Sequence, residues 1–423
     1  MIDIKQIREN PESFKNACKA KIFYVDIDRL IELDSQLRKT KTRLQEIITE
    51  KNSLGKSIPK LSGDEKQKIL NKLGELKNEE AAIGEQIKNP QPEFDELMLQ
   101  VPQPADEDVP FGKDDTENVE IARWGQIRKF AFELKDHVQL GLALDIIDIE
   151  RAVRLAGTRN YFLKGAGAML HWAILRFAMD FMIQKGYVPF SVPMLMRNEV
   201  MAGTGYYPGS EEQTYRMERD ELNLAGTAEV PLTAYFTNEI LPQEILPRKF
   251  AGLSTCYRRE AGAAGKDTYG LYRIHQFDKV EQVVICENDA EQSAKFHEEI
   301  RANAESVMQA IGIPYRVVKV CTGDLGRGQA KKYDIEAWMP SRKGFGETHS
   351  ASKFYDFQAR RLNLRYKDSK TKKNLFCHTL NNTVIASPRI LIPILELNQN
   401  KDGSVNIPKV LQPYMNGMER ITK

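Results

Sequence analysis

The chain has few cysteines, little net charge and no long apolar run. Its 423 residues include five cysteines, no two of them closer than 30 residues, and no Cys-x-x-Cys pair. Structural zinc sites need cysteine or histidine ligands at short spacing, so we expect no zinc. Isolated single thiols are typical of a reducing compartment, which favours a cytoplasmic location.

The small charge and the absence of long apolar segments limit the partners. The formal net charge is +2, so a nucleic acid would have to be contacted through a local basic surface. The first residues, Met1 to Lys5, lack the apolar run of a signal peptide. The most apolar window, residues 169–183, contains His171, Arg176 and Asp180, which favours a buried helix and no membrane contact. The length indicates two or three domains.

Two heptad patterns stand out near the N-terminus. The first runs over residues 30–61 in steps of three and four: Leu30, Leu33, Leu37, Thr40, Leu44, Ile47, Lys51, Leu54, Ile58 and Leu61. The second follows Pro59, Ser62 and Gly63: Ile69, Leu73, Leu76, Glu80, Ile83, Ile87, Phe94 and Leu97. Ser62 and Glu65 have the spacing of a capping box. The patterns predict an antiparallel coiled-coil arm over about 28–100, whose first helix would span roughly 45 Å, in an N-terminal domain of residues 1–105.

Charge is distributed unevenly along this arm. Residues 36–60 hold seven Lys or Arg and two Glu, a net charge of +5, whereas residues 64–96 hold five Lys and nine acids, a net charge of −4. Two interpretations stay open. The two helices can simply attract each other, or the basic helix can contact RNA phosphates.

The remaining residues, 106–423, predict one α+β domain with an antiparallel sheet. Residues 101–111 read as a linker and residues 119–132 as polar and irregular. We expect strands at 250–257, 271–284, 315–321, 333–338 and 375–379, and helices at 138–156, 168–185, 229–240, 289–311 and 384–398.

Residues 257–281 carry the strongest chemical signal. Two apolar-alternating segments flank a small-residue loop, a pattern typical of a hairpin. Arg258 can hold a phosphate or carboxylate through two parallel hydrogen bonds. Phe277 offers a face on which adenine can stack, and Glu281 can accept from an ammonium or hydroxyl group. The hairpin therefore predicts a nucleotide and amino-acid site.

This hairpin resembles motif 2 of the class II aminoacyl-tRNA synthetases, in the sequence variant that is typical of the seryl-tRNA synthetases. Further phrases of that family follow in order over nearly the whole length: Thr227-Ala228-Glu229, Glu347 with Ser350, Asp356-Phe357-Gln358-Ala359-Arg360-Arg361, His378-Thr379-Leu380-Asn381 and Val410 to Met415. A single Arg-x-Glu would carry no weight, but five such phrases in the family order are specific.

The resemblance implies a serine–tRNA ligase that forms seryl-adenylate and pyrophosphate from serine and ATP, then transfers serine to the 3′ end of its tRNA. It implies that Arg258, Glu260 and Arg389 are catalytic and that the basic side of the arm binds serine tRNA, leaving open whether selenocysteine tRNA is charged too. It also implies a Mg²⁺ ion and, from residues 186–193 as motif 1, a homodimer.

The implied site residues fall into four sets. Those for L-serine are Thr227, Ala228, Glu229, Arg258, Glu281 and Thr383. Those for ATP are Arg258, Arg259, Glu260, Ile274, Phe277, Glu347, Thr348, His349, Ser350 and Arg389. Those for Mg²⁺ are Glu347 and Ser350, and those for tRNA are Arg38, Lys39, Lys41, Arg43 and Lys51.

The sequence departs from the family at several places and leaves alternatives open. The second arginine of Tyr257-Arg258-Arg259-Glu260, Tyr269 at the end of the loop and the segment 382–389 are unusual. Taken alone, Arg258 with Glu260 also fits a surface ion pair, Phe277 a core residue and Thr227 a helix cap. Two other functions remain: a ligase that loads an amino acid onto a carrier protein, although such relatives lack the arm, and a non-catalytic tRNA-binding paralogue.

Overall fold

The computed structural model describes residues 1–262 and 269–423. The chain divides into two compact units, Met1–Pro104 and Ala105–Lys423. The hairpin loop that the sequence placed between Ala261 and Asp267 lies largely outside the described residues.

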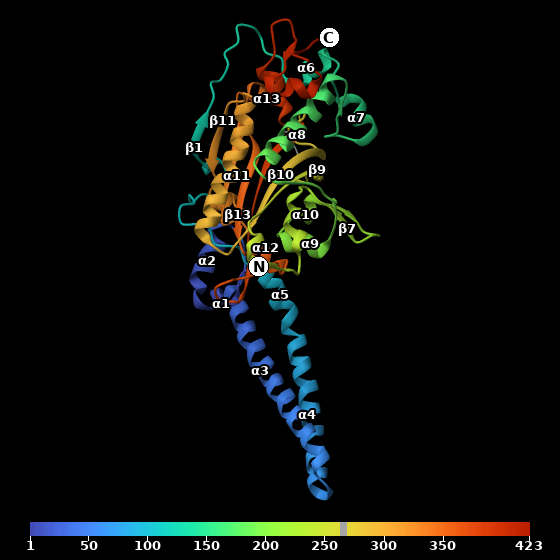
Figure 1. Ribbon diagram of the computed structural model, residues 1–423, viewed down its shortest axis with the longest axis vertical. Helices are drawn as coiled ribbons and strands as arrows, with labels where there is room; N and C mark the ends of the chain where they lie inside the picture. Colours follow the sequence, from blue (N-terminus) through green and yellow to red (C-terminus); the bar gives the residue numbers. More distant parts are fainter. Residues whose placement is uncertain (263–268) are drawn as a thin grey trace. The chain divides into compact units, whose positions relative to one another are not determined.

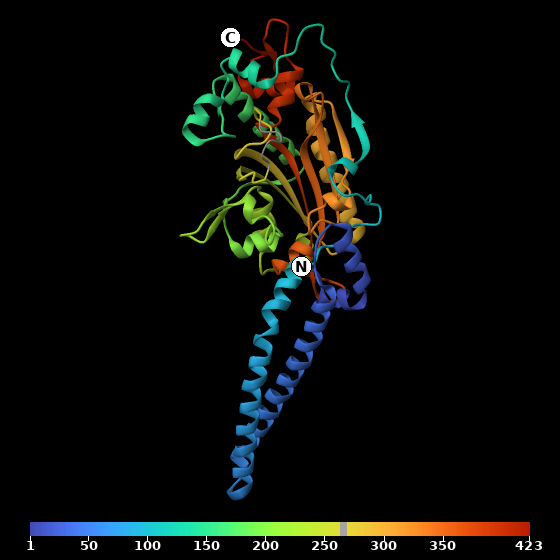
Figure 2. The same ribbon diagram turned by 180° about the vertical axis from the view of Figure 1, so that it is seen from behind.

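The first unit is helical. Its elements are α1 (Ile4–Glu9), α2 (Pro11–Ala20), α3 (Ile27–Ser57), α4 (Gly63–Lys88) and α5 (Pro90–Gln100), with a short 3₁₀ turn at Ile58–Lys60. α3 packs against α4 and α5, which return along it in the opposite direction (Figures 1 and 2). The predicted antiparallel arm is confirmed.

The heptad seam supplies the core of this arm. Ile47, Leu76 and Ile83 are buried between the two long helices, with Leu44 and Leu54 packed beside them. The predicted capping box at Ser62 is wrong: among the described residues, the Ser62 hydroxyl makes no capping hydrogen bond. Gly63, directly after Ser62, has a left-handed backbone (φ 59°), which departs from the geometry of an ordinary first helical turn.

The second unit is built on an eight-stranded sheet. In spatial order its strands are β1 (Val119–Trp124), β11 (Tyr315–Lys319), β12 (Lys331–Met339), β13 (Gly344–Tyr355), β16 (His378–Ser387), β10 (Gln276–Cys286), β9 (Arg248–Tyr257) and β4 (Val188–Ser191). All neighbours pair antiparallel except β4 and β9. The α+β fold class with an antiparallel sheet is confirmed.

Successive side chains of the central strand β10 point to opposite faces of the sheet, and each face carries its own hydrophobic core. Val280 and Val284 pack into the larger cluster, together with α8 (Ala166–Gln184) and α11 (Ala290–Ala310) (Figure 1). Val283 and Ile285 point to the other face and pack in a second cluster. This second face also carries α10 (Glu229–Thr233) and α12 (Phe357–Arg361).

The apolar helix α8 belongs to the core. Among the described residues it is the one helix that is long and apolar enough to cross a membrane. Leu170, Ile174, Ala178 and Met182 are buried against the sheet. They follow helical spacing, which explains why the sequence predicted a buried helix.

Several predicted boundaries are wrong. Residues 138–156 form α6 (His137–Ala143), the short strand β2 (Ile147–Asp148) and α7 (Ile149–Ala156). The segment 119–132 contains the edge strand β1. Residues 384–387 continue β16, so the last long helix shortens to α13 (Leu391–Leu397). The predicted helix over 229–240 ends at Thr233, and Ile240–Pro242 pairs as β8.

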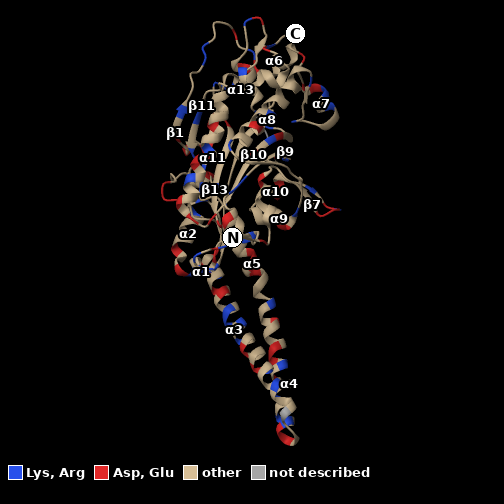
Figure 3. Cartoon of the chain, viewed as in Figure 1, with Lys and Arg blue, Asp and Glu red and all other residues tan. Residues whose placement is uncertain are grey.

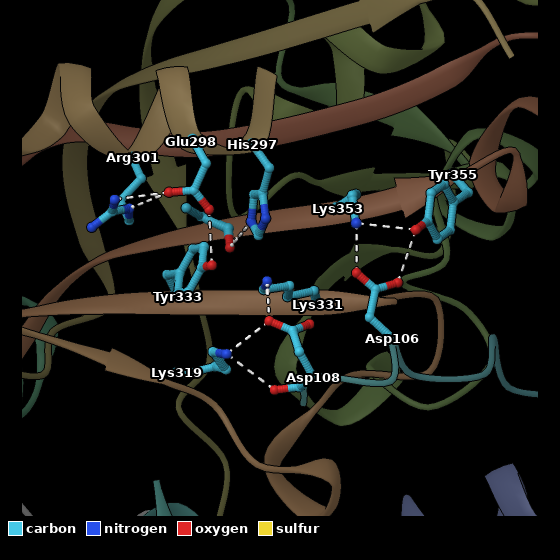
Figure 4. Close-up of polar contacts among 11 residues, drawn as sticks. Asp106, Asp108, His297, Glu298, Arg301, Lys319, Lys331, Tyr333, Lys353 and Tyr355 are labelled. Carbon is cyan, nitrogen blue, oxygen red and sulfur yellow. Dashed lines mark hydrogen bonds and ion pairs between the residues drawn. The ribbon is translucent and has the colours of Figure 1, made fainter. Parts of the chain in front are cut away.

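Two aspartates fasten the beginning of the second unit onto the sheet (Figure 4). Asp106 forms an ion pair with the buried Lys353 of β13 and accepts a hydrogen bond of 2.9 Å from Tyr355. Asp108 pairs with Lys319 at 2.7 Å and Lys331 at 2.6 Å. The segment expected to be a linker is therefore held against strands β11, β12 and β13.

Candidate functional site

The hairpin of β9 and β10 supplies one wall of a pocket in the second unit. The strands pair with Tyr257 opposite Gln276 and Gly252 opposite Glu281. Side chains two residues apart share a strand face, and Phe277, Lys279 and Glu281 all line the pocket. The period of two thus brings an aromatic ring, an ammonium and a carboxylate into one cavity.

The cavity has a volume of about 210 Å³. It is lined by residues from β10, β13, β16, α10 and the neighbouring loops: Tyr206, Glu229, Arg258, Glu260, Tyr272, Ile274, Phe277, Lys279, Glu281, Gln329, Glu347, Thr348, Ser350, Ser352, Asn381, Thr383, Ala386 and Arg389. Most of the residues predicted for serine and ATP lie in this lining.

Four predicted residues lie outside it. Thr227 and Ala228 are buried. The ring of His349 is bound to Thr348 Oγ1 (2.8 Å) and to the carbonyl of Val384 (3.0 Å). Arg259 reaches Glu212 at 3.8 Å on the surface. These four can act on a ligand only through neighbours or through their backbone.

One end of the cavity holds a compact polar group. Lys279 Nζ donates to Thr227 Oγ1 (2.7 Å) and forms an ion pair with Glu281. Thr383 Oγ1 lies 3.4 Å from Glu281 Oε2. Thr227 Oγ1 also accepts from the backbone N–H of Glu229 (3.1 Å), but the N-cap residue of α10 is Ala228, so the helix-cap alternative for Thr227 is wrong by one residue. This group combines an ammonium, a carboxylate and two hydroxyls, and it can therefore bind a small zwitterion that carries a hydroxyl group.

Glu229 has an unusual electrostatic environment. It is buried, and this burial together with the nearby charge of Glu281 raises its pKa to about 7. Hydrogen bonds from Gln358 and Tyr206 and the charge of Lys279 oppose the shift. A carboxylate in this state gains free energy when a cation such as an ammonium group reaches it.

Arg258 separates this end from an aromatic region. Its Nε donates to the carbonyl of Gly226 (3.3 Å), and its guanidinium lies 5.2 Å from the ring centroid of Phe277. Arg258 lines the same cavity as two carboxylates, Glu229 and Glu281. A planar cation here can bridge a carboxylate and a phosphate.

The far end is rich in aromatic and guanidinium groups. Arg389 lies 4.4 Å from the ring centroid of Tyr272 and donates to the carbonyls of Tyr272 (2.9 Å) and Glu347 (3.0 Å). Glu260 has a left-handed backbone (φ 52°) and accepts from Arg273 at 2.9 Å. This ion pair joins Glu260 to Arg273, whereas the sequence left open one between Glu260 and Arg258; both Glu260 and Arg258 line the cavity.

Glu347 and Ser350 line one side of the cavity and could hold a metal ion. Within residues 1–262 and 269–423, no three His, Cys, Asp or Glu side chains cluster as metal ligands. Ser350 stands opposite Asp334, and burial with the nearby Glu347 charge raises the pKa of Asp334 to about 7, although Lys332 lies 3.3 Å away. A divalent cation would relieve this crowding of carboxylates, and Mg²⁺ accepts few protein ligands beside substrate oxygens and water.

Several lining residues were not predicted. Lys279, Tyr206 and Tyr272 are the most important of them. Lys279 could have been found, because it stands between Phe277 and Glu281 on the same strand face. Tyr206 and Tyr272 come from irregular segments, where no period indicates the direction of a side chain.

The basic residues predicted for tRNA lie on α3 (Figure 3). Arg43 pairs with Glu79 at 2.7 Å, Lys51 pairs with Glu80, and Lys41 donates to Gln91 at 2.8 Å. These contacts support the interpretation that the helices attract each other. Arg38, 63% exposed at its side chain, lies 3.9 Å from Asp34 on its own helix, and Arg38 and Lys39 border a shallow hollow with Thr42.

Comparisons with known proteins cover both units. Residues 1–104 match the model of the seryl-tRNA synthetase N-terminal domain, and residues 213–398 match the class II tRNA synthetase core domain (G, H, P, S and T). The chain is 44% identical to a serine–tRNA ligase of Deinococcus radiodurans, over 99% of this chain and 98% of that protein. It is 41% identical to the serine–tRNA ligase of Treponema denticola, over 100% of both.

Solved structures agree with these matches. Seryl-tRNA synthetase of Pyrococcus horikoshii, complexed with ATP, superposes with a TM-score of 0.92 at 38% identity, covering 100% of this chain and 99% of that chain. The cytoplasmic serine–tRNA ligase of Naegleria fowleri, in complex with AMP, gives a TM-score of 0.89 at 32% identity with the same coverage. An enzyme with this pocket and these relatives is an aminoacyl-tRNA ligase, and the chain belongs to the seryl-tRNA synthetase family.

Proposed function

We propose that this protein is a serine–tRNA ligase that uses the pocket described above for both steps of its reaction. The observation that supports this most directly is the joining of two chemistries in one cavity. The group of Thr227, Lys279, Glu281 and Thr383 suits serine, and Arg258 connects it to the aromatic side. Residues 106–423 are the catalytic domain in this proposal, and residues 1–105 the tRNA-binding domain.

In the first step a serine carboxylate oxygen attacks the α-phosphorus of ATP, and pyrophosphate leaves with the electrons of the broken P–O bond. Arg258 bridges the α-phosphate and the serine carboxylate. Such reactions require positioning and charge neutralisation more than covalent help. In the second step a ribose hydroxyl of the tRNA attacks the seryl carbonyl, and AMP leaves.

The other groups orient the two substrates. Glu229 receives the serine ammonium, while Glu281 and Thr383 receive its hydroxyl. Phe277 stacks on adenine with Ile274 beside it, Glu260 meets the adenine edge, and Arg389 neutralises the γ-phosphate. Thr348, with the backbone at Arg259 and His349, completes the ATP side. Glu347 and Ser350 would hold Mg²⁺, which would supply positive charge to the phosphate oxygens when bound.

The serine end explains how related amino acids would be separated. A buried site built for a hydroxyl group rejects alanine and glycine strongly, because its polar groups would remain unpaired. Threonine is separated by space alone. The matching N-terminal domain and the full-length relatives disfavour the carrier-protein ligase and the non-catalytic paralogue that the sequence left open.

The experiment that tests the activity is amino-acid-dependent ATP–pyrophosphate exchange without tRNA. Serine should support exchange, and alanine and glycine should not. Exchange with alanine or glycine in place of serine would identify a carrier-type ligase, and no exchange with any amino acid would favour a non-catalytic protein. Charging of purified serine and selenocysteine tRNAs then decides which tRNA is the partner. We place this reaction in the cytoplasm, since all five cysteines are buried thiols.

We also propose a homodimer through the region of α8 and β4. Trp172 on α8 is 65% exposed, and Val188 on β4 and Leu253 on β9 are large exposed apolar side chains on adjacent elements. β4 ends the sheet, so one of its edges is open to pairing. Sedimentation should give twice the mass of the 48.3 kDa chain, and Trp172→Glu should shift the protein toward monomer. A wild-type monomer at micromolar concentration would refute the proposal.

A further inference from the structure

Directly behind the pocket lies a glutamine whose amide is fully used. Gln358, on α12, is 0% exposed. Its Nε2 donates to Glu229 Oε1 (2.9 Å) and to the carbonyl of Thr204 (2.9 Å). Its Oε1 accepts from Thr379 Oγ1 (2.6 Å), on β16. Gln358 itself is not part of the cavity lining.

These three partners fix the orientation of the amide. If the amide were turned over, its oxygen would face the Thr204 carbonyl and the Glu229 carboxylate, two groups that can only accept when the carboxylate is ionised. A buried oxygen in that position would lose two hydrogen bonds. The Nε2 group is therefore directed at Glu229 by the surrounding protein, independently of any ligand.

Glu229 is held on its other oxygen as well. Tyr206, which lines the cavity, donates its hydroxyl to Glu229 Oε2 at 3.0 Å. Each carboxylate oxygen thus accepts one fixed hydrogen bond from the protein. A second lone pair on each oxygen stays available for a donor that enters the cavity.

We propose that Gln358 and Tyr206 are positioning residues that keep the Glu229 carboxylate ionised and oriented for the amino group of the amino-acid substrate. The inference rests on the role proposed above for Glu229. It adds two residues to the amino-acid site, one of which touches no substrate. Hydrogen bonds that donate to a carboxylate favour its ionised form over its protonated form.

The charges around Glu229 explain why it needs this support. Burial and the carboxylate of Glu281 on β10 favour its protonated form, while Lys279 on β10 favours the ionised form. Arg258, at the end of β9, lies close enough to interact with Tyr206. Without the two donors, the protonation equilibrium of Glu229 shifts toward the neutral carboxyl group, which binds an ammonium poorly.

The test uses Gln358→Met and Tyr206→Phe, which remove donors and preserve most of the volume. Pyrophosphate exchange is measured from about pH 5.5 to about pH 9, with KM determined separately for serine and ATP. In each variant the acid limb of kcat/KM for serine should move upward by about one pH unit, and KM for serine at neutral pH should rise on the order of tenfold. KM for ATP should stay within about twofold, because Glu229 meets only the amino acid.

The matched control is Gln282→Met. Gln282 is also 0% exposed, and its amide binds the carbonyl of Ile300 (2.8 Å) and Asn303 (3.1 Å), away from the pocket. This control measures the cost of removing a buried amide. A Gln358→Met profile that matches Gln282→Met, or equal rises in the two KM values, would overturn the proposal. If Gln358→Met does not fold, Tyr206→Phe decides alone, through the acid limb.

Failure of the proposed function has a different signature. Wild-type protein without serine-dependent exchange would refute the activity itself. A Glu229→Gln variant with an unchanged KM for serine would refute the role of Glu229, and the inference with it. Normal exchange, a serine defect in Glu229→Gln and no effect of Gln358→Met or Tyr206→Phe would refute the inference alone.

Discussion

Lys279 is the residue on which the amino-acid end of the pocket depends. Its ammonium contacts Thr227 and Glu281 and opposes protonation of Glu229. Lysine is seldom fully buried without a paired charge, and Lys279 is only 5% exposed. Its position thus indicates that the polar groups of the amino-acid site are arranged before any ligand enters.

Replacing Lys279 with methionine tests this arrangement. The change leaves the buried Glu281 carboxylate without its cation, which costs free energy. Serine-dependent pyrophosphate exchange should fall on the order of 100-fold in kcat/KM. Lys249→Met is the matched control, since Lys249 on β9 also pairs with a glutamate, Glu299 at 2.7 Å, but outside the pocket. Equal decreases in the two variants would contradict a specific role.

The sequence indicated the roles of some site residues but not of others. Arg258, Phe277, Glu281 and Glu347 carry recognisable chemistry in ordered phrases, and the structure brings them into one cavity. Gln358 is recognisable in the sequence only as part of a phrase, because its role depends on Thr204 and Glu229, which are 154 and 129 residues away. Contacts over such separations leave no local period in a sequence.

At the scale of elements, periodicity explains both the successes and the errors. The heptads of α3 and α4 predicted the arm, since their period of about 3.5 residues repeats over many turns. The helix predicted over 384–398 was wrong at its start because Val384 and Ile385 are apolar on both sides of a buried strand. A strand buried on both faces has a continuous apolar run and resembles a buried helix.

The exposed basic residues of α3 allow a test of RNA binding that separates the two interpretations of its charge. Neutralising Arg38 and Lys39 to glutamine should weaken tRNA binding and reduce the slope of log Kd against log salt by about one for each phosphate that is no longer neutralised. Pyrophosphate exchange without tRNA should not change. Lys66→Gln with Lys68→Gln on α4 provides the control for the change in net charge. An unchanged salt slope in the α3 variant would show that Arg38 and Lys39 do not contact tRNA phosphates.

The segment that begins the second unit allows a comparison of two similar anchors. Asp106→Asn leaves Lys353, which is 3% exposed, without its carboxylate, and should lower the free energy of unfolding by about 3 kcal/mol. Asp108→Asn should cost less than about 1 kcal/mol, because the Asp108 side chain is 52% exposed and solvent screens its ion pairs. Chemical denaturation followed by tryptophan fluorescence measures both. Equal costs would contradict the assigned difference in burial.

At the scale of the whole molecule, three buried histidines of the second unit make the stability of the protein depend on pH. His349 and His378 lie on β13 and β16 of the eight-stranded sheet, and His297 lies on α11, which packs against these strands. Burial lowers the pKa of each to about 4, from an ordinary value near 6.5. Below about pH 6.5 the unfolded chain therefore binds protons that the folded chain does not, and each histidine makes stability fall as the pH drops toward 4.

The raised pKa values of Glu229 and Asp334, both about 7, act in the opposite direction over the same range, because the folded state then holds the extra proton. The free energy of unfolding of the wild type therefore changes with pH as a sum of opposing contributions. The difference in this free energy between the wild type and a variant that lacks one titrating group isolates the contribution of that group. His297→Gln removes one titrating group while leaving a donor for the Ala351 carbonyl, which His297 Nε2 contacts at 2.9 Å. The stability gap between wild type and His297→Gln should be largest above about pH 6.5 and shrink steadily toward pH 4. A gap that stays constant across this range, measured by denaturation at each pH, would mean that His297 is not held neutral by burial.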